Sequence, residues 1–235
     1  MHPALVNLIA ASLAFVGTHF AMSHPLHPAM VRMFGEKGFS AVYSLVSLAI
    51  FGWMIWAFRQ VPPFGRKLWA GYDEVSWTLA SALTLVSLVL FLGSLRGNPA
   101  FPGPSPHPEG PLPEPRGVFL VTRHPMMWGF ALWALAHIMI APTGRTLVIG
   151  LAIGFLALVG AHMQDRKKRE LMGERWADWQ AKTHFWPRWR HVFRAGLVLW
   201  LIALVLWLVL TWAHIPTAYV PAGIWRWPAL SSWLG

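Results

Sequence analysis

Residues 77–95 read WTLASALTLVSLVLFLGSL, nineteen residues without a charged side chain. An α-helix rises about 1.5 Å per residue, so this run is long enough to cross most of a bilayer core about 30 Å thick. Five further apolar stretches of similar length occupy residues 4–22, 41–58, 118–141, 146–163 and 195–213. The sequence therefore predicts an all-α, polytopic membrane protein with six transmembrane helices, which form a single domain over residues 1–235.

The composition agrees with a membrane protein and excludes several other classes. The 235-residue chain is 56% hydrophobic and 12% charged, whereas an average soluble domain is about 25% charged. So few charges exclude a soluble globular enzyme, and so much hydrophobicity excludes a disordered chain. The chain has no cysteine, which excludes disulfides, thiolate metal sites and a cysteine nucleophile. Histidine, with eleven copies, becomes the candidate metal ligand.

The basic residues predict how the chain is oriented. Fourteen of the nineteen lysines and arginines lie in or beside residues 23–40, 96–117 and 164–194. Cytoplasmic loops carry an excess of such residues. We therefore expect these loops to be cytoplasmic and both termini periplasmic, in a bacterial inner membrane. The basic charge is confined to loops without an aromatic-lined platform, so the expected partner is the lipid bilayer and no nucleic acid.

Three connecting segments differ in character. Residues 97–115 hold eight prolines and three glycines, which predicts an extended linker. The segment from Arg166 to Trp179 predicts an interfacial, amphipathic cytoplasmic helix, with Trp176 and Trp179 on one face in the headgroup layer. After the last predicted span, the tryptophans at positions 225, 227 and 233 are expected to anchor the tail at the outer interface.

Two histidines within predicted spans are the strongest candidates for chemistry. His137 follows Arg123 by fourteen residues and His19 precedes Arg32 by thirteen, which predicts similar depths in two different helices. A histidine in the bilayer is expected to be neutral, and neutral imidazole binds iron well. Two such residues are suited to hold a planar apolar cofactor, of which haem is the obvious one. The alternative is that each only donates a hydrogen bond to a neighbouring helix.

The sequence Arg123-His124-Pro125, with Gly129, marks the start of the fourth predicted span. Proline suits the first turn of a helix, where its missing N–H costs nothing. Arg123 is placed to hold an anionic group such as a carboxylate or a haem propionate. The alternative reading is a basic anchor combined with a helix start.

Several motifs are similar to those of the NnrU family of integral membrane proteins. They are THFAMSHP at 18–25, GEKGF at 35–39, YSLVSL at 43–48, VTRHPMMWG at 121–129 and LWALAH at 132–137. The resemblance covers most of the chain, and the segment 121–137 is its most specific part. It extends to zeta-carotene cis-trans isomerase, a haem b enzyme with histidine ligands.

The resemblance implies a haem b cofactor with His137 as one axial ligand and His19 as the other, with His24 as the alternative. Arg123 and His124 would border the haem. The isomerase has a cysteine three residues before the fourth-span ligand, and here that position is Ala134. The implied role is in denitrification or nitric oxide metabolism, with respiratory or denitrification proteins as partners, or in redox-linked isomerisation of a lipophilic substrate.

A more distant likeness is to isoprenylcysteine carboxyl methyltransferases. Arg123, His124, Pro125 and Gly129 match their pattern, and Glu170 and Gly173 precede Trp176 and Trp179 where that family has tyrosines. This likeness implies an S-adenosylmethionine-dependent methyltransferase. A cofactor-free assembly factor for respiratory complexes is the third hypothesis, so the sequence leaves open whether the protein is an enzyme.

Overall fold

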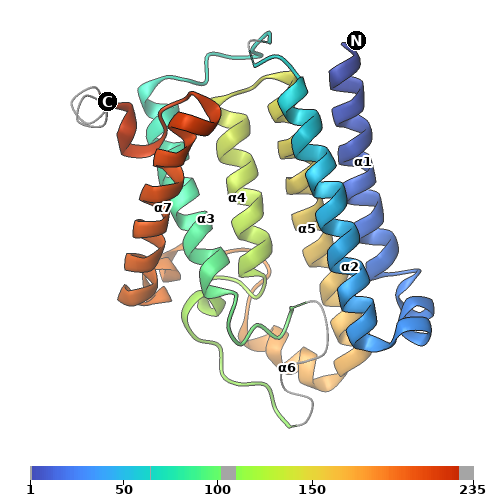
Figure 1. The fold of residues 1–235 in the computed structure, drawn as a ribbon. Helices are drawn as coiled ribbons and strands as arrows, with labels where there is room; N and C mark the ends of the chain where they lie inside the picture. The colour runs from blue at the N-terminus through green and yellow to red at the C-terminus, as the bar shows by residue number, and fades with distance from the viewer. Residues whose placement is uncertain (1, 64, 102–109, 228–235) are drawn as a thin grey trace.

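The computed structural model describes residues 2–63, 65–101 and 110–227, and these contain helices and no strand. The α-helices are α1 (Pro3–Ser23), α2 (His27–Gln60), α3 (Glu74–Gly93), α4 (Pro125–Ile140), α5 (Gly144–Met172), α6 (Glu174–Lys182) and α7 (Leu197–Ala218) (Figure 1). Short 3-10 helices are η1 (Gly117–Leu120), η2 (Trp189–Ala195) and η3 (Gly223–Arg226). The predicted all-α class is confirmed.

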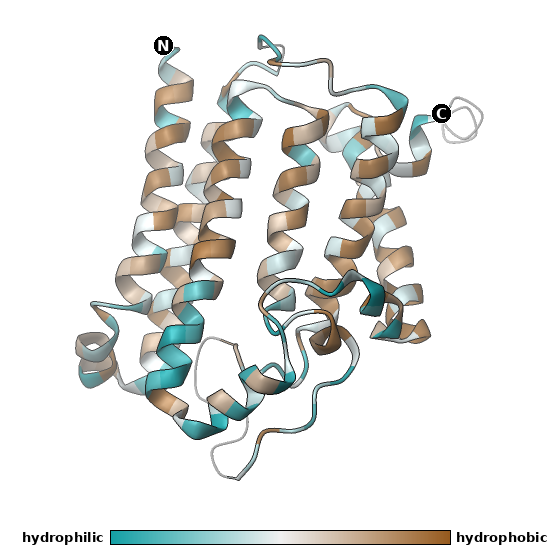
Figure 2. Cartoon of the chain, turned by 180° about the vertical axis from the view of Figure 1, so that it is seen from behind, coloured by the Kyte–Doolittle hydropathy of each residue, from teal (hydrophilic) through white to brown (hydrophobic). Residues whose placement is uncertain are grey.

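Helices α1 to α5 and α7 run alternately up and down the molecule (Figure 1). We call the end where α1, α3 and α5 finish the basic end, and the opposite end, which holds the N-terminus, the far end. Hydrophilic residues gather at the basic end, on the last turns of α5 and on α6 (Figure 2). Helix α5 packs between α1 and α4, α3 packs against α4 and α7, and α2 packs on α1. Which end faces the cytoplasm stays a prediction.

Five helices are long and apolar enough to cross a membrane: α1, α2, α3, α5 and α7. Helix α4 is apolar but has 16 residues, so it is about 24 Å long at 1.5 Å per residue. The predicted span 118–141 begins too early, because residues 117–120 form η1 and the helix starts at Pro125. Six predicted spans thus correspond to five long helices and one short one, in a multi-pass membrane protein.

Helices α2 and α5 extend further than the sequence predicts. Helix α2 begins at His27 and is kinked at Gly35, where φ is 68°, a backbone conformation that glycine adopts without a steric penalty. Helix α5 continues to Met172, so the segment from Arg166 onward is not a separate helix. Gly173, with φ of 54°, separates it from α6.

The prediction that Trp176 and Trp179 lie in the headgroup layer is wrong. Their exposed fractions are 0% and 2%, and both belong to the hydrophobic core between α3, α4 and the segments at the basic end. Trp179, for example, packs edge-on against Phe119 of η1. The indoles face the protein because η1 and the linker cover α6 at this end.

Small residues allow α4 to approach its neighbours closely. A Cβ added at Gly129 would lie 2.9 Å from the carbonyl oxygen of Ser87 on α3. The Ser87 hydroxyl donates a 2.7 Å hydrogen bond to the Gly129 carbonyl. On the α5 side, a Cβ at Gly150 would lie 2.6 Å from Ile138. Such close approaches at glycine are typical of membrane helix pairs, and they fix α4 between α3 and α5.

The tail folds back on the far end. The Trp225 indole donates to the Leu208 carbonyl and the Thr211 hydroxyl, each at 3.2 Å, and Trp227 packs edge-on against Trp77. Trp233 lies outside the described residues, as do positions 102–109 of the predicted linker. The described flanks of that linker, residues 97–101 and 110–115, contain no helix.

Candidate functional site

Arg123 and Asp165 form an ion pair at the basic end. The Arg123 Nε lies 2.9 Å from each carboxylate oxygen of Asp165, and Nη2 contacts Oδ2 as well. The two side chains are 13% and 9% exposed. A fork-like contact of this kind is among the strongest hydrogen-bonded pairs in proteins, and it joins the start of α4 to the last turns of α5.

His124 completes the same cluster. Its Nε2 lies 2.7 Å from Asp165 Oδ1, and because an ionised carboxylate only accepts, Nε2 is the donor. The residue is 2% exposed. This burial lowers the pKa of His124 below its ordinary value, although the carboxylate acts in the opposite direction. We call Arg123, His124 and Asp165 the basic-end triad.

The backbone around the triad is tied to the segment after α6. The Thr122 hydroxyl donates to the Phe185 carbonyl at 2.8 Å, and the Arg123 N–H donates to the His184 carbonyl at 2.8 Å. The Trp128 indole donates to the Phe185 carbonyl at 2.9 Å. The triad therefore sits in a network of internal hydrogen bonds that locks α4, α5 and residues 184–185 together.

A different arrangement surrounds His137 in the last turn of α4. Its Nδ1 lies 2.8 Å from the Trp133 carbonyl of the same helix. Since a carbonyl only accepts, Nδ1 carries the proton and Nε2 carries the lone pair. His214 on α7 makes the equivalent contact, with Nδ1 2.8 Å from the Leu210 carbonyl. The centres of the two imidazole rings are 6.3 Å apart.

His19 lies elsewhere, between α1 and α2. Its Nδ1 is 2.7 Å from the Phe15 carbonyl, and its ring meets that of Tyr43 edge-on at 5.5 Å. His24, the predicted alternative, follows the last residue of α1. Both histidines therefore lie toward the basic end.

The structure does not bring His19 and His137 together. His19 is four residues before the end of α1 at the basic end, whereas His137 is three residues before the end of α4 at the far end (Figure 1). Helix α5 packs between α1 and α4 (Figure 2). The predicted equal depth is wrong because Arg32 lies in α2, after the chain has already turned back.

The structure also separates Arg123 and His124 from His137. His137 comes thirteen residues after His124, which is about 20 Å along a helix. The Arg123 guanidinium is already bound to Asp165. The structure therefore gives no support to the expectation that Arg123 and His124 border a haem held by His137, and that expectation stays a prediction.

Sequence reasoning missed two residues of these clusters. Asp165 comes two residues after the predicted span 146–163 and is one of only nine acidic residues, so its position next to an apolar run was the signal in the sequence. His214 comes directly after the predicted sixth span, 195–213, and resembled an ordinary residue at a helix end. No group of three or more histidine, aspartate or glutamate side chains suited to a metal occurs among the described residues.

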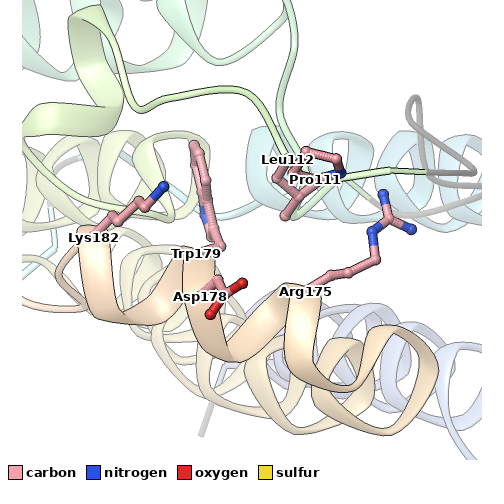
Figure 3. Close-up of a pocket in the computed structure, with 6 residues that line it drawn as sticks. All are labelled: Pro111, Leu112, Arg175, Asp178, Trp179 and Lys182. Carbon is pink, nitrogen blue, oxygen red and sulfur yellow. The ribbon is translucent and has the colours of Figure 1, made fainter.

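The residues of the methyltransferase likeness lie around α6 and the end of α5. Glu170 is 67% exposed and pairs with Arg166 at 3.3 Å. The buried indole N–H groups of Trp176 and Trp179 have no hydrogen-bond partner among the described residues. Trp179 also lines a small pocket with Pro111, Leu112, Arg175, Asp178 and Lys182 (Figure 3). This pocket is at the basic end, remote from His137.

Comparison with known proteins gives a family and no closer relative. No curated protein and no solved structure matches the chain. A family model described as NnrU protein matches residues 7–222, which includes the basic-end triad and both His137 and His214. The match extends over most of the chain, so the protein is a member of the NnrU family.

Proposed function

We propose that the protein is an integral membrane haem b protein in which His137 is an axial ligand. The observation that carries this proposal is the state of the His137 ring. Its Nδ1 donates to the Trp133 carbonyl, which leaves the Nε2 lone pair available in an apolar helix. Metal-binding histidines almost always donate their other N–H to a backbone carbonyl or carboxylate in this way.

A haem held by His137 would supply one-electron redox chemistry within the membrane. The apolar residues of α4 provide a low dielectric, and an axial imidazole helps to set the reduction potential. Both roles implied by the family resemblance, in nitric oxide metabolism and in isomerisation of a lipophilic substrate, use reactants that are soluble in a bilayer. We therefore infer that the reaction partner approaches His137 through the membrane.

The test is the absorbance of protein expressed with an ample haem supply and purified in mild detergent. We expect a Soret band, and a pyridine haemochrome spectrum typical of haem b. His137→Ala should abolish or shift the band. The matched control is His162→Ala, since His162 is exposed on α5 and its loss should leave the spectrum unchanged. A wild-type protein without a Soret band would contradict the proposal and favour a cofactor-free assembly factor.

The methyltransferase hypothesis has less support from the geometry. The polar groups of Arg123 and His124 are engaged by Asp165, so they are not available to orient a polar cofactor. The Glu170 carboxylate forms an ion pair with the exposed Arg166. We expect no saturable binding of S-adenosylmethionine in isothermal titration, and saturable binding would revive that hypothesis.

A further inference from the structure

We propose that His214 of α7, and not His19, is the second axial ligand of this haem. The inference rests on the proposed haem function and replaces the ligand pair that the sequence predicts. It concerns two residues of the chain at the far end, His137 near the end of α4 and His214 near the end of α7.

The separation of the two rings fits one metal ion between them. Metal–imidazole nitrogen bonds are about 2 Å long. With about 1 Å from each nitrogen to its ring centre, two imidazoles on opposite sides of one metal ion have ring centres about 6 Å apart. The observed separation is 6.3 Å.

Both histidines are also in the tautomer that ligation requires. Each Nδ1 donates to the carbonyl four residues earlier in its own helix, at 2.8 Å in both cases. These contacts fix the tautomer and the orientation of the rings, and leave both Nε2 lone pairs free. The Trp133 ring, 4.1 Å from that of His137, restricts the movement of His137 further.

At the far end, the connection between α2 and α3 is hydrogen-bonded to the ends of both α4 and α7. In that connection, the Trp69 indole donates to the Met139 carbonyl at 2.9 Å, just after His137. The Tyr72 hydroxyl donates to the Pro221 carbonyl at 2.9 Å, just after α7. One loop therefore binds both helix ends, which keeps the two imidazoles at a fixed separation before any cofactor binds.

His19 has the same tautomer as His214, with Nδ1 2.7 Å from the Phe15 carbonyl, but it does not lie near His137. It contacts Phe15 and Tyr43, near the basic end of α1, and α5 stands between α1 and α4. A second consequence follows from the His214 assignment. If His137 and His214 both hold the iron, an added gas such as carbon monoxide would have to displace one imidazole in order to bind.

The experiment compares His214→Ala and His19→Ala in haem-loaded protein by absorbance and electron paramagnetic resonance. We expect a low-spin ferric wild type and a low-spin His19→Ala. His214→Ala should become high-spin or lose haem, and its ferrous form should bind carbon monoxide at least tenfold faster than wild type. Added free imidazole should return His214→Ala to the low-spin spectrum. His214→Met, which keeps a ligand atom and side-chain length, covers the case in which His214→Ala does not fold.

The outcomes separate this inference from the proposed function. A wild type without a Soret band contradicts both. A haem-loaded wild type whose spectrum changes in His19→Ala, and stays the same in His214→Ala and His214→Met, keeps the haem function and overturns the His214 assignment. A high-spin wild type overturns the assignment too, because it shows that one axial position is open.

Discussion

The two ends of α4 carry histidines in opposite situations. At the basic end, His124 and Arg123 direct their polar groups at Asp165, and the surrounding backbone is hydrogen-bonded to residues 184–185. At the far end, His137 and His214 each use one ring nitrogen for their own helix, and the other nitrogen has no partner in the part of the chain that the structure describes. A polar cluster whose groups satisfy one another stabilises the fold, whereas a pair with spare lone pairs is equipped to bind.

The strongest test of this difference between the two ends is to remove the Asp165 carboxylate at the basic end. Asp165→Ala leaves Arg123 and His124 buried without their shared acceptor. Breaking a buried ion pair on one side costs about 3–5 kcal/mol, so we expect a large loss of folded protein and of thermal stability in detergent. The control is Glu170→Ala, which breaks an exposed pair worth at most about 0.5 kcal/mol. Equal melting temperatures for Asp165→Ala and Glu170→Ala would show that the triad is not structural.

The same measurement at the far end sharpens the contrast. In haem-free protein, His137→Ala removes a ring whose Nε2 bonds to no group among the described residues, so we expect a loss of about 1 kcal/mol, typical of single substitutions. Thermal unfolding of the haem-free variants in one detergent checks this. If His137→Ala destabilises haem-free protein as much as Asp165→Ala does, the far-end pair has a structural role that this account does not give it.

A smaller effect is the loss of folding stability at acidic pH. Burial lowers the pKa of His124, so the folded protein keeps this imidazole neutral while the unfolded chain takes up a proton near pH 6.5. The unfolded state then binds more protons, and stability falls as the pH drops below about 6.5, by at most about 1.4 kcal/mol per pH unit.

The measurement for this acid effect is the melting temperature between pH 8 and pH 5. His124→Gln keeps a donor for Asp165 but does not titrate, so its melting temperature should depend less on pH over this range. Parallel curves for wild type and His124→Gln would contradict the assignment of the acid effect to His124.

The sequence predicted the class of fold because membrane helices depend on one local property. Uncharged runs such as 77–95 are visible in the chain, and α3 follows that run closely. Loop geometry is not local. Gly35 bends α2 and Gly173 ends α5, each with a positive φ angle. Glycines at many other positions neither bend nor end a helix, so the sequence alone does not show which ones will.

The candidate site was harder to predict than the spans. His137 was identified, but its neighbour depends on which helices pack together, and that is set by contacts such as Gly129 against α3. Counting residues from Arg32 placed His19 at the wrong depth because the chain reverses between α1 and α2. Asp165 was missed because a charge beside many basic residues looks like part of a solvated segment until the structure shows that it is buried.

The central claim is that His137 faces His214 and not His19, and cysteine crosslinking tests it most directly, since the chain has no native cysteine. The double variants His137→Cys/His214→Cys and His19→Cys/His137→Cys would be treated in membranes with a short thiol-specific crosslinker and analysed by mass spectrometry. We predict an efficient crosslink between positions 137 and 214 and none between 19 and 137. A crosslink between 19 and 137, without one between 137 and 214, would contradict the account.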